Sequence, residues 1–554
     1  MRRRGFFPLF AAILLAGAAQ LLVLPPFEGF DETAHYSYIR EIADTHLVPV
    51  FGRSTIATIV AEYHQLGPMP YTSVPPFNQN GGWTYETFAA NRAAQNAYRE
   101  RFRAAGHPER RYQPTSELNW EAQHPPLYYA LLAPVMRATD RLSFNAQFFV
   151  LRLVSYLLAA FGLVVGLSAS LRFFPNETIS RRALMAGALL YPFLVPMFLP
   201  EFGRLGNDSL CMFLVGATWA ALLAVIAERH HARAPLVLGV VLGLGLLTKA
   251  FFLPIGTGVF LYLIYRCMVV RHDPTLARAR LREALTVAAT ALATGGWWYA
   301  YKFLAFNSIT GGAELINLDA QGGLLPNLQQ KFAIRYFARG VIALLASGYY
   351  TGTWSLTRLP ELLYVPGLLL LAVIAVRSYQ QLRHLPVSEP EWGPLWMAAP
   401  VLGGFLYFIL ARIALSGSGN DLAGWYFNVL APVLAVLIGL SLMGPPAGRT
   451  AGWIVRLLAA YALAFFVAGQ WAQTTLYAGC AVKTAESKYY VFPDSAFCLT
   501  RLSPLATNLA VVGWPRLAAV CFVAAMLCLV LGVKMVAPRG IFADRADQDT
   551  AVRT

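Results

Sequence analysis

An acidic pair followed by a histidine, Asp31-Glu32-Thr33-Ala34-His35, comes directly after the first apolar run of the sequence. Residues three and four apart on a helix are neighbours, so a helix that begins near Asp31 brings both carboxylates to His35. A carboxylate held in a partly dry site has its pKa raised toward the working range of a general base. We therefore predict that Asp31 is a catalytic base. The alternative is that Asp31 only caps the helix.

Two further interpretations of the same stretch stay open. Glu32 either orients a substrate or Asp31, or it is a solvated charge at the membrane interface. Asp31 and His35, four residues apart, could also supply two ligands to a divalent metal ion. Helical zinc motifs usually bring two histidines at that spacing and a third group, so this pair is a weak metal signal. We assign no metal site and leave a divalent metal open as a cofactor.

Cations that could hold a phosphate lie further along the chain. Lys249 ends an apolar stretch, where it either binds a lipid-linked phosphate or extends to the lipid headgroups. Arg204 and His124 are rival phosphate ligands. Asn207, Asp208 and Lys302 are further polar residues. The expected order of membrane spans brings them to the same, outer face of the membrane.

The elements that must position these residues are membrane helices. The 554-residue chain is 57% hydrophobic and 13% charged, whereas about a quarter of the residues of a soluble protein are charged. Many apolar runs approach the ~20 residues that span a bilayer, and only helices satisfy the backbone there. The sequence therefore predicts an all-α polytopic membrane protein. The net charge of +15 reflects arginines in short inner loops, the positive-inside pattern, and we exclude a nucleic-acid partner.

About twelve transmembrane helices are expected, in a single transmembrane domain over residues 1–554. The expected spans are roughly 1–25, 147–171, 183–200, 209–227, 235–249, 251–266, 284–301, 360–376, 394–413, 426–443, 452–470 and 515–536. The basic start of the chain places the N-terminus in the cytoplasm and Asp31 outside the cytoplasmic membrane, and about twelve spans return the C-terminus to the cytoplasm.

Three long outer segments are expected between these spans: 26–146, which carries the acidic motif, 302–358, and 471–512. The first is expected to hold interfacial helices over 33–48 and 85–105, and a short apolar helix begun by Pro125-Pro126. Cys480 and Cys498 both fall in the third and could pair in an oxidising compartment; this bridge stays open. The sequence has no Walker A loop, dinucleotide fingerprint or Gly-x-Ser-x-Gly elbow. The energy for a group transfer would have to arrive in the donor.

Several short motifs occur in a fixed order along the first 300 residues or so. They are Asp31-Glu32, Pro125-Pro126-Leu127-Tyr128-Tyr129, Asn207-Asp208, Gly245-Leu246-Leu247-Thr248-Lys249 and Gly296-Trp297-Trp298-Tyr299. In this order they resemble the GT-C class of membrane glycosyltransferases, in particular the group of lipid A aminoarabinose transferases and protein O-mannosyltransferases. They also resemble a related set of uncharacterised bacterial membrane proteins, which the last motif fits.

The resemblance implies a GT-C-like fold, a polyprenyl-phosphate sugar donor, and a glycan, lipid or protein acceptor met at the outer membrane face in cell-envelope glycan biosynthesis. It implies that Asp31 is the catalytic carboxylate and Asp208 a second acidic site residue. In the aminoarabinose transferases a lysine before the proline pair contacts the lipid phosphate. Here His124 stands there, so phosphate binding is expected from Lys249 or Arg204.

The predicted function is a glycosyltransferase that uses a polyprenyl-phosphate sugar and works among membrane lipids. Its predicted catalytic residues are Asp31, Glu32 and Asp208, and its predicted substrate- or phosphate-binding residues are His35, His124, Arg204, Asn207 and Lys249. One alternative is a flippase or transporter of lipid-linked sugars. Another is an O-antigen polymerase or ligase, whose key residues would lie in 302–358.

Overall fold

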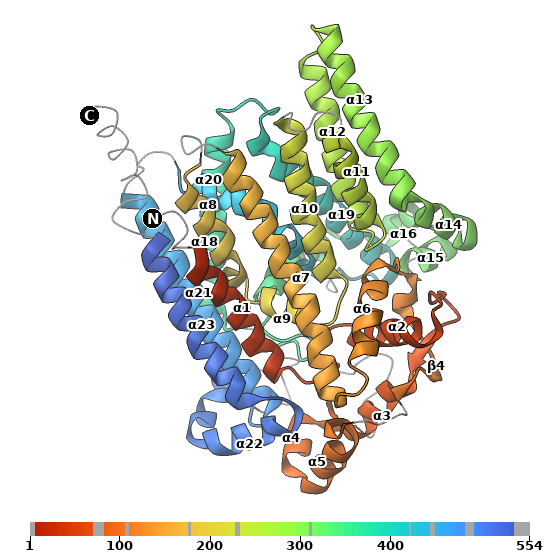
Figure 1. The fold of residues 1–554 in the computed structure, drawn as a ribbon, viewed down its shortest axis with the longest axis vertical. Helices are drawn as coiled ribbons and strands as arrows, with labels where there is room; N and C mark the ends of the chain where they lie inside the picture. The colour runs from red at the N-terminus through yellow and green to blue at the C-terminus, as the bar shows by residue number, and fades with distance from the viewer. Residues whose placement is uncertain are drawn as a thin grey trace.

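A computed structural model of the chain describes residues 6–69, 82–105, 110–174, 179–227, 233–309, 313–357, 359–419, 423–443, 449–481 and 492–536. In these residues nearly all regular structure is helical (Figure 1). The predicted all-α class is confirmed.

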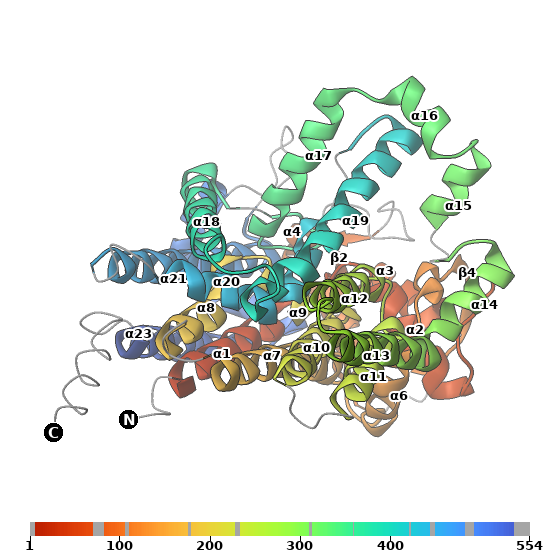
Figure 2. The ribbon, with the colours of Figure 1, turned by 90° about the horizontal axis from the view of Figure 1, so that it is seen from above.

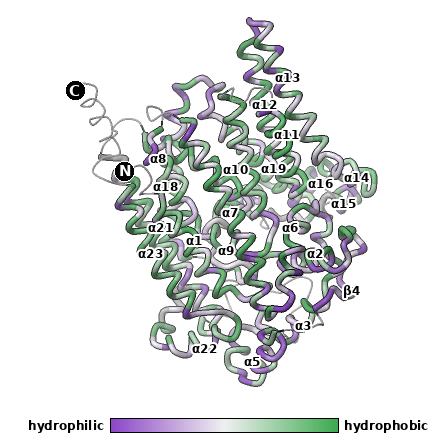
Figure 3. Tube along the Cα trace, viewed as in Figure 1, coloured by the Kyte–Doolittle hydropathy of each residue, from purple (hydrophilic) through white to green (hydrophobic). Residues whose placement is uncertain are grey.

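Eight helical stretches of the described residues are long and apolar enough to cross a membrane. They contain α7 (Phe144–Phe173), α10 (Asp208–Ile226), α12 (Phe252–Val269), α18 (Glu361–Leu382), α19 (Gly393–Ser416), α20 (Ala431–Ser441), α21 (Arg449–Tyr477) and α23 (Pro515–Val536). Two begin with short 3-10 turns, η6 (Pro390–Trp392) before α19 and η7 (Gly424–Leu430) before α20. In Figure 3 the helices of this bundle are mainly hydrophobic along their length.

The other four expected spans are also helical but are too short or too polar to meet the same requirement. They correspond to α1 (Phe6–Val23), to α8 (Arg181–Leu194) with the short α9 (Phe198–Gly203), to α11 (Arg233–Leu246), and to α13 (Pro274–Ala291). A π-helical turn, η4 (Leu292–Gly296), joins α13 to α14 (Trp297–Phe306). All twelve expected spans therefore coincide with helices, eight of which qualify as spans by length and composition.

The first and last spans pack against each other, since α1 lies along α23, while α7 packs on α10 and α8 on α20. The tip between α12 and α13 lies at one end of the bundle, and α3, α5 and α22 lie at the other (Figure 1). The extreme ends of the chain, residues 1–5 and 537–554, lie outside the described residues. The cytoplasmic location of both termini stays a prediction.

The first outer segment folds into short elements against the bundle. Its helices are α2 (Glu32–Thr45), α3 (Thr58–Leu66), α4 (Tyr85–Ala90), α5 (Arg92–Tyr98), η1 (Arg99–Arg103), η3 (Trp120–Gln123) and α6 (Leu127–Ala138). Strand β1 (Thr55–Ala57) pairs antiparallel with β4 (Pro114–Leu118), and β2 (Pro68–Met69) pairs parallel with β3 (Trp83–Thr84). The expected helix over 85–105 is wrong as one element, because Asn91 ends α4 and its side chain caps α5.

The second outer segment contains α15 (Ala313–Ala320), α16 (Leu324–Lys331), α17 (Ile334–Ala346) and the turn η5 (Ser347–Tyr349). Figure 2 shows α15 to α17 as an arc outside the bundle, and all three contact α19. The third outer segment holds η8 (Phe492–Arg501) and α22 (Leu502–Val512). A disulfide joins Cys480 to Cys498, so the bridge that the sequence left open is formed.

Candidate active site

A cavity of about 680 Å³ lies where the first outer segment meets α12 and α19. Its polar lining residues are Asp31, His35, Trp120, Glu121, Gln123, His124, Arg204 and Lys249. Its other lining residues are Ala250, Phe251, Pro254, Val401, Gly404, Phe405, Phe408, Ala423 and Tyr426. The cavity therefore has a charged wall and an apolar wall, and five of the eight predicted site residues line the charged one.

Asp31 precedes α2 in left-handed backbone, with φ 60° and ψ 9°, a conformation that short polar side chains tolerate. Its carbonyl oxygen accepts hydrogen bonds from the N–H groups of Ala34 (3.0 Å) and His35 (2.9 Å), but its side chain makes no capping bond. Instead Trp120 Nε1 donates to Asp31 Oδ1 at 3.1 Å. The alternative in which this carboxylate only caps the helix is therefore wrong.

The environment of Asp31 moves its titration toward neutral pH. Burial raises the pKa of Asp31 to about 6, and the negative charge of Glu121 adds to the rise. Arg204 and the Trp120 hydrogen bond act in the opposite direction and limit it. A carboxylate with this pKa is ionised at neutral pH and binds a proton more readily than an ordinary aspartate, as a general base requires.

The imidazole ring of His35 does not pair with the two carboxylates that the sequence spacing assigned to it. His35 Nδ1 lies 2.9 Å from Tyr129 Oη and 3.4 Å from Glu121 Oε2. Burial lowers the pKa of His35 to about 3, so its ring is neutral. The predicted contact is wrong because Asp31 and Glu32 turn to other partners on either side of α2.

Glu121 is the centre of a cluster on the charged wall. Its Oε2 lies 3.1 Å from His124 Nε2 and accepts a hydrogen bond from Tyr129 Oη at 3.3 Å. Burial alone would raise the pKa of Glu121, but His124, His35 and Lys249 together hold it well below its usual range. Glu121 is therefore ionised, and its charge acts on Asp31.

The two cations of the cavity share one buried carboxylate. Lys249 Nζ lies 2.7 Å from Asp208 Oδ1, and Arg204 Nη2 lies 2.7 Å from Asp208 Oδ2. Arg204 also pairs with Glu201 at 2.8 Å. Asp208 is the first residue of α10, where the helix dipole favours a negative charge. Asp208 does not line the cavity, and it fixes the two cations that do. Lys249 Nζ also lies 4.5 Å from the ring centre of Tyr426.

Two predicted site residues, Glu32 and Asn207, lie behind the cavity rather than on it. The carboxylate of Glu32 is fully buried and accepts four hydrogen bonds. The donors are Arg152 Nε (2.7 Å), Arg152 Nη2 (2.5 Å) and the backbone N–H groups of Gly29 (2.9 Å) and Leu205 (2.7 Å). Glu32 therefore does not stand in solvent or line the cavity, and its predicted role in orienting Asp31 stays a prediction. Asn207 is also buried, with Nδ2 3.4 Å from Tyr129 Oη.

Residues far apart in sequence hold the loop before Asp31 in place. Glu28 accepts hydrogen bonds from Tyr85 Oη (2.6 Å) and the N–H of Ser355 (3.0 Å), while Phe30 stacks on Trp425 at 4.6 Å. Burial raises the pKa of Glu28 to about 7. These contacts place residues from α4, from the second outer segment and from η7 around one short loop.

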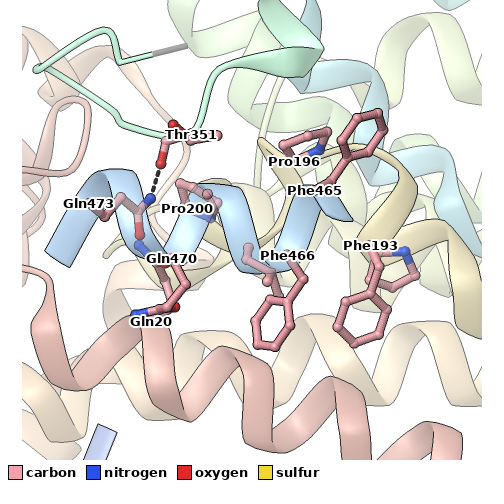
Figure 4. A pocket seen from close by; sticks show the side chains of 12 residues that line it. Gln20, Phe193, Pro196, Pro200, Thr351, Phe465, Phe466, Gln470 and Gln473 are labelled. Carbon is pink, nitrogen blue, oxygen red and sulfur yellow. Dashed lines mark hydrogen bonds between the residues drawn. The ribbon is translucent and has the colours of Figure 1, made fainter. Parts of the chain in front are cut away.

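The helix α21 supports the same part of the second outer segment from below. Gln473 Nε2 donates a hydrogen bond to the carbonyl oxygen of Thr351, as Figure 4 shows. The small pocket drawn there, lined by Gln20, Phe193 and Phe466 among others, has a volume of about 20 Å³. That is room for a water molecule but not for a substrate.

Sequence reasoning missed Glu121, Trp120 and Arg152. The spacing of Glu121 and His124, three residues apart and just before two prolines, was the signal that could have found the cluster. No comparable local signal marks Arg152, which lies inside a span. Among the described residues no group of three or more His, Cys, Asp or Glu side chains could hold a metal ion.

The helical bundle and the apolar spans define a polytopic α-helical membrane protein, here with a charged cavity at one end. Residues 14–415 match a family described as "Predicted membrane protein (DUF2142)". The chain belongs to this family. No curated protein matches the sequence.

Solved structures similar to this chain include two membrane glycosyltransferases. ArnT from Cupriavidus metallidurans, bound to undecaprenyl phosphate, has 15% identity and a TM-score of 0.45, and the match covers 97% of this chain and 79% of that one. The oligosaccharyltransferase of Archaeoglobus fulgidus, tethered with an acceptor peptide, has 13% identity and a TM-score of 0.40, with 93% and 56% covered. At these identities and TM-scores the similarity carries no conclusion about the activity of this chain.

Proposed function

We propose that this protein is a glycosyltransferase that moves one sugar from a polyprenyl-phosphate donor to an acceptor at the outer face of the cytoplasmic membrane. The observation that carries the proposal is the two-walled cavity. Its charged wall, with Asp31 and Lys249, suits a sugar phosphate, and its apolar wall, from α12 and α19, suits an isoprenoid chain. A ligand that contacts both walls has a charged head and an apolar chain, and a polyprenyl-phosphate sugar has both.

Asp31 acts as the general base in this proposal. Its carboxylate takes the proton from an acceptor hydroxyl, whose oxygen then forms a bond to the anomeric carbon of the donor. The bond from that carbon to the phosphate oxygen breaks, and its electron pair leaves with the polyprenyl phosphate. Asp31 returns the proton to solvent. Because this is a single displacement, the configuration at the anomeric carbon inverts. The sugar–phosphate bond supplies the energy.

Lys249 is the favoured ligand for the departing phosphate, since negative charge grows there in the transition state. Its ammonium group has three N–H donors, of which one is directed at Asp208. Arg204 and His124 line the same wall and add donors. Asp208 is then a positioning residue that holds Lys249 and Arg204, and Glu32 fixes the loop that carries Asp31.

A donor screen tests the proposal. Purified protein in nanodiscs receives a panel of polyprenyl-phosphate sugars together with crude envelope acceptors, and release of free polyprenyl phosphate is measured. We expect release by the wild type and none by Asp31→Asn, with both proteins showing the same melting temperature. Undiminished release by Asp31→Asn would remove Asp31 from the mechanism. Movement of an uncleaved lipid-linked sugar across vesicles, without product, would favour the flippase.

A further inference from the structure

A second cavity, of about 270 Å³, adjoins the candidate active site. One 3-10 turn separates the two: Trp120, Glu121 and Gln123 of η3 line the larger cavity, and Ala122 lines the smaller one. The other residues of the smaller cavity come from the stretch after α2, from the residue before α6, and from α14. They are Val48, Pro49, Val50, Phe51, Pro126, Trp297, Trp298, Tyr301 and Lys302. Figures 1 and 2 show α14 at the edge of the bundle, near α2.

Lys302 is a buried cation to which the described residues offer no anion. The residue is 1% exposed, and its side chain reaches the smaller cavity. Its Nζ lies 4.4 Å from the ring centre of Phe306, 5.2 Å from that of Phe51 and 5.7 Å from that of Trp298. In the part of the chain that the structure describes, Lys302 has no hydrogen bond or ion pair. Aromatic rings offset only part of the cost of taking an ammonium group from water.

This sets Lys302 apart from the cations of the larger cavity. Lys249 and Arg204 each have a carboxylate oxygen at 2.7 Å, whereas the described residues offer none to Lys302. The charge of Lys302 is available for a ligand. Beside it, the rings of Trp297 and Tyr301 are about half exposed, and flat exposed rings suit the apolar face of a sugar.

We propose that this smaller cavity binds an anionic saccharide, a sugar that carries a phosphate or a carboxylate, as the recognition element of the acceptor. Lys302 pairs with the anion, and Trp297 and Tyr301 hold the sugar ring. The proposal rests on the proposed function, because a bound acceptor here needs only to reach past η3 to present a hydroxyl to Asp31. The same chemistry fits a free glycan and the headgroup of a glycolipid.

Binding measurements test this site without any turnover. Glucose 1-phosphate, neutral methyl glucoside and a lipid-linked sugar phosphate are titrated into the protein in nanodiscs, with wild type, Lys302→Met and Trp297→Ala. We expect Lys302→Met to weaken binding of glucose 1-phosphate by about tenfold or more, the usual effect of losing a charge-assisted hydrogen bond, and to leave the neutral glycoside unaffected. Trp297→Ala should weaken both. Tighter binding of the lipid-linked probe that Lys302→Met removes would identify a glycolipid, and a Lys302-dependent affinity equal to that of glucose 1-phosphate would identify a free glycan.

Lys534→Met is the matched control, because Lys534 is exposed on α23 and its loss removes the same charge. Lys302→Arg, which keeps the charge, should retain part of the affinity. Equal affinity of wild type and Lys302→Met for glucose 1-phosphate would overturn the proposal. Undecaprenyl phosphate binding to the same samples reports on the larger cavity, so failure of the acceptor site and failure of the proposed function give different results.

Discussion

The hydrogen bond from Trp120 to Asp31 and the charge of Glu121 act on the same titration in opposite directions. If Asp31 is the base, the rate of donor cleavage falls as the pH drops through about 6, where its carboxylate takes up a proton. Trp120→Phe removes a hydrogen-bond donor that favours the ionised form of Asp31. The acid limb of the pH–rate profile, where the rate falls at low pH, should therefore move to higher pH. Glu121→Gln removes a negative charge that disfavours the ionised form of Asp31, so the acid limb of the profile should move to lower pH.

The size of the first shift follows from the bond that is lost. A hydrogen bond to a charged group contributes about 1.5–3 kcal/mol, and each pKa unit corresponds to about 1.4 kcal/mol. Trp120→Phe should therefore raise the acid limb by about one to two pH units. For Glu121→Gln the structure gives the direction alone. His35 adds no limb of its own in this range because its ring is neutral above a pKa of about 3.

The assay is the pH dependence of polyprenyl phosphate release, measured from about pH 4.5 to 8.5 at saturating donor. Glu117→Gln is the control, since it removes an exposed carboxylate from β4 that does not act on Asp31. Its profile should match the wild type. Acid limbs that stay in place in both test variants, or move the same way, would show that Asp31 is not the titrating group.

Three other predictions follow from residues around the site. Arg152→Met leaves the fully buried charge of Glu32 without its partner, which should lower the free energy of unfolding by about 3–5 kcal/mol, measured by denaturation in detergent. Gly404→Leu should raise the KM for a polyprenyl-phosphate donor, because Gly404 lines the apolar wall and a Cβ there meets open space. Glu28 alone should lower the free energy of unfolding by about 3 kcal/mol as the pH rises from about 4.5 to about 7, since over that range the folded state holds a proton on Glu28 (pKa about 7) that the unfolded chain (4.5) releases.

Each of these has its own control. The double variant that replaces Glu32 and Arg152 with apolar residues should recover part of the lost free energy of unfolding, because it leaves no buried charge without a partner. Gly403→Leu adds the same side chain where it also meets open space but does not line the cavity, so its KM should stay that of the wild type. The difference in stability between the wild type and Glu28→Gln should change by this amount across that range, and a difference that stays constant would assign the effect to another group.

Periodicity and charge in the sequence predicted the helices and half of the cavity. Apolar runs near the length of a bilayer specify spans with little help from tertiary contacts, and each expected span is helical. Asp31 and Lys249 lie directly at the ends of such runs, so the ends of the helices bring them to one place. Their arrival in one cavity could be expected from topology alone.

The hydrogen-bond and ion-pair partners of the site residues could not be predicted from the sequence, because they depend on how the helices pack. Asp31 and Glu32 are neighbours in sequence, yet Asp31 faces the cavity and Glu32 faces Arg152 of α7, because Asp31 has left-handed backbone just before α2 begins. No propensity rule predicts that turn. Glu121 was missed for a similar reason: the 3-10 turn that carries it is too short to leave a periodic signal.

The stacking of Phe30 on Trp425 gives the maturation of this protein an order in time. The loop with Asp31 leaves the ribosome before Trp425, which follows about 400 residues later. At 5–20 residues per second, about 20–80 s separate the two. During that interval the nascent chain has its acidic loop but not the aromatic cover that fixes it. The loop that carries Asp31 is therefore held in its final position only after the residues up to Trp425 have been made.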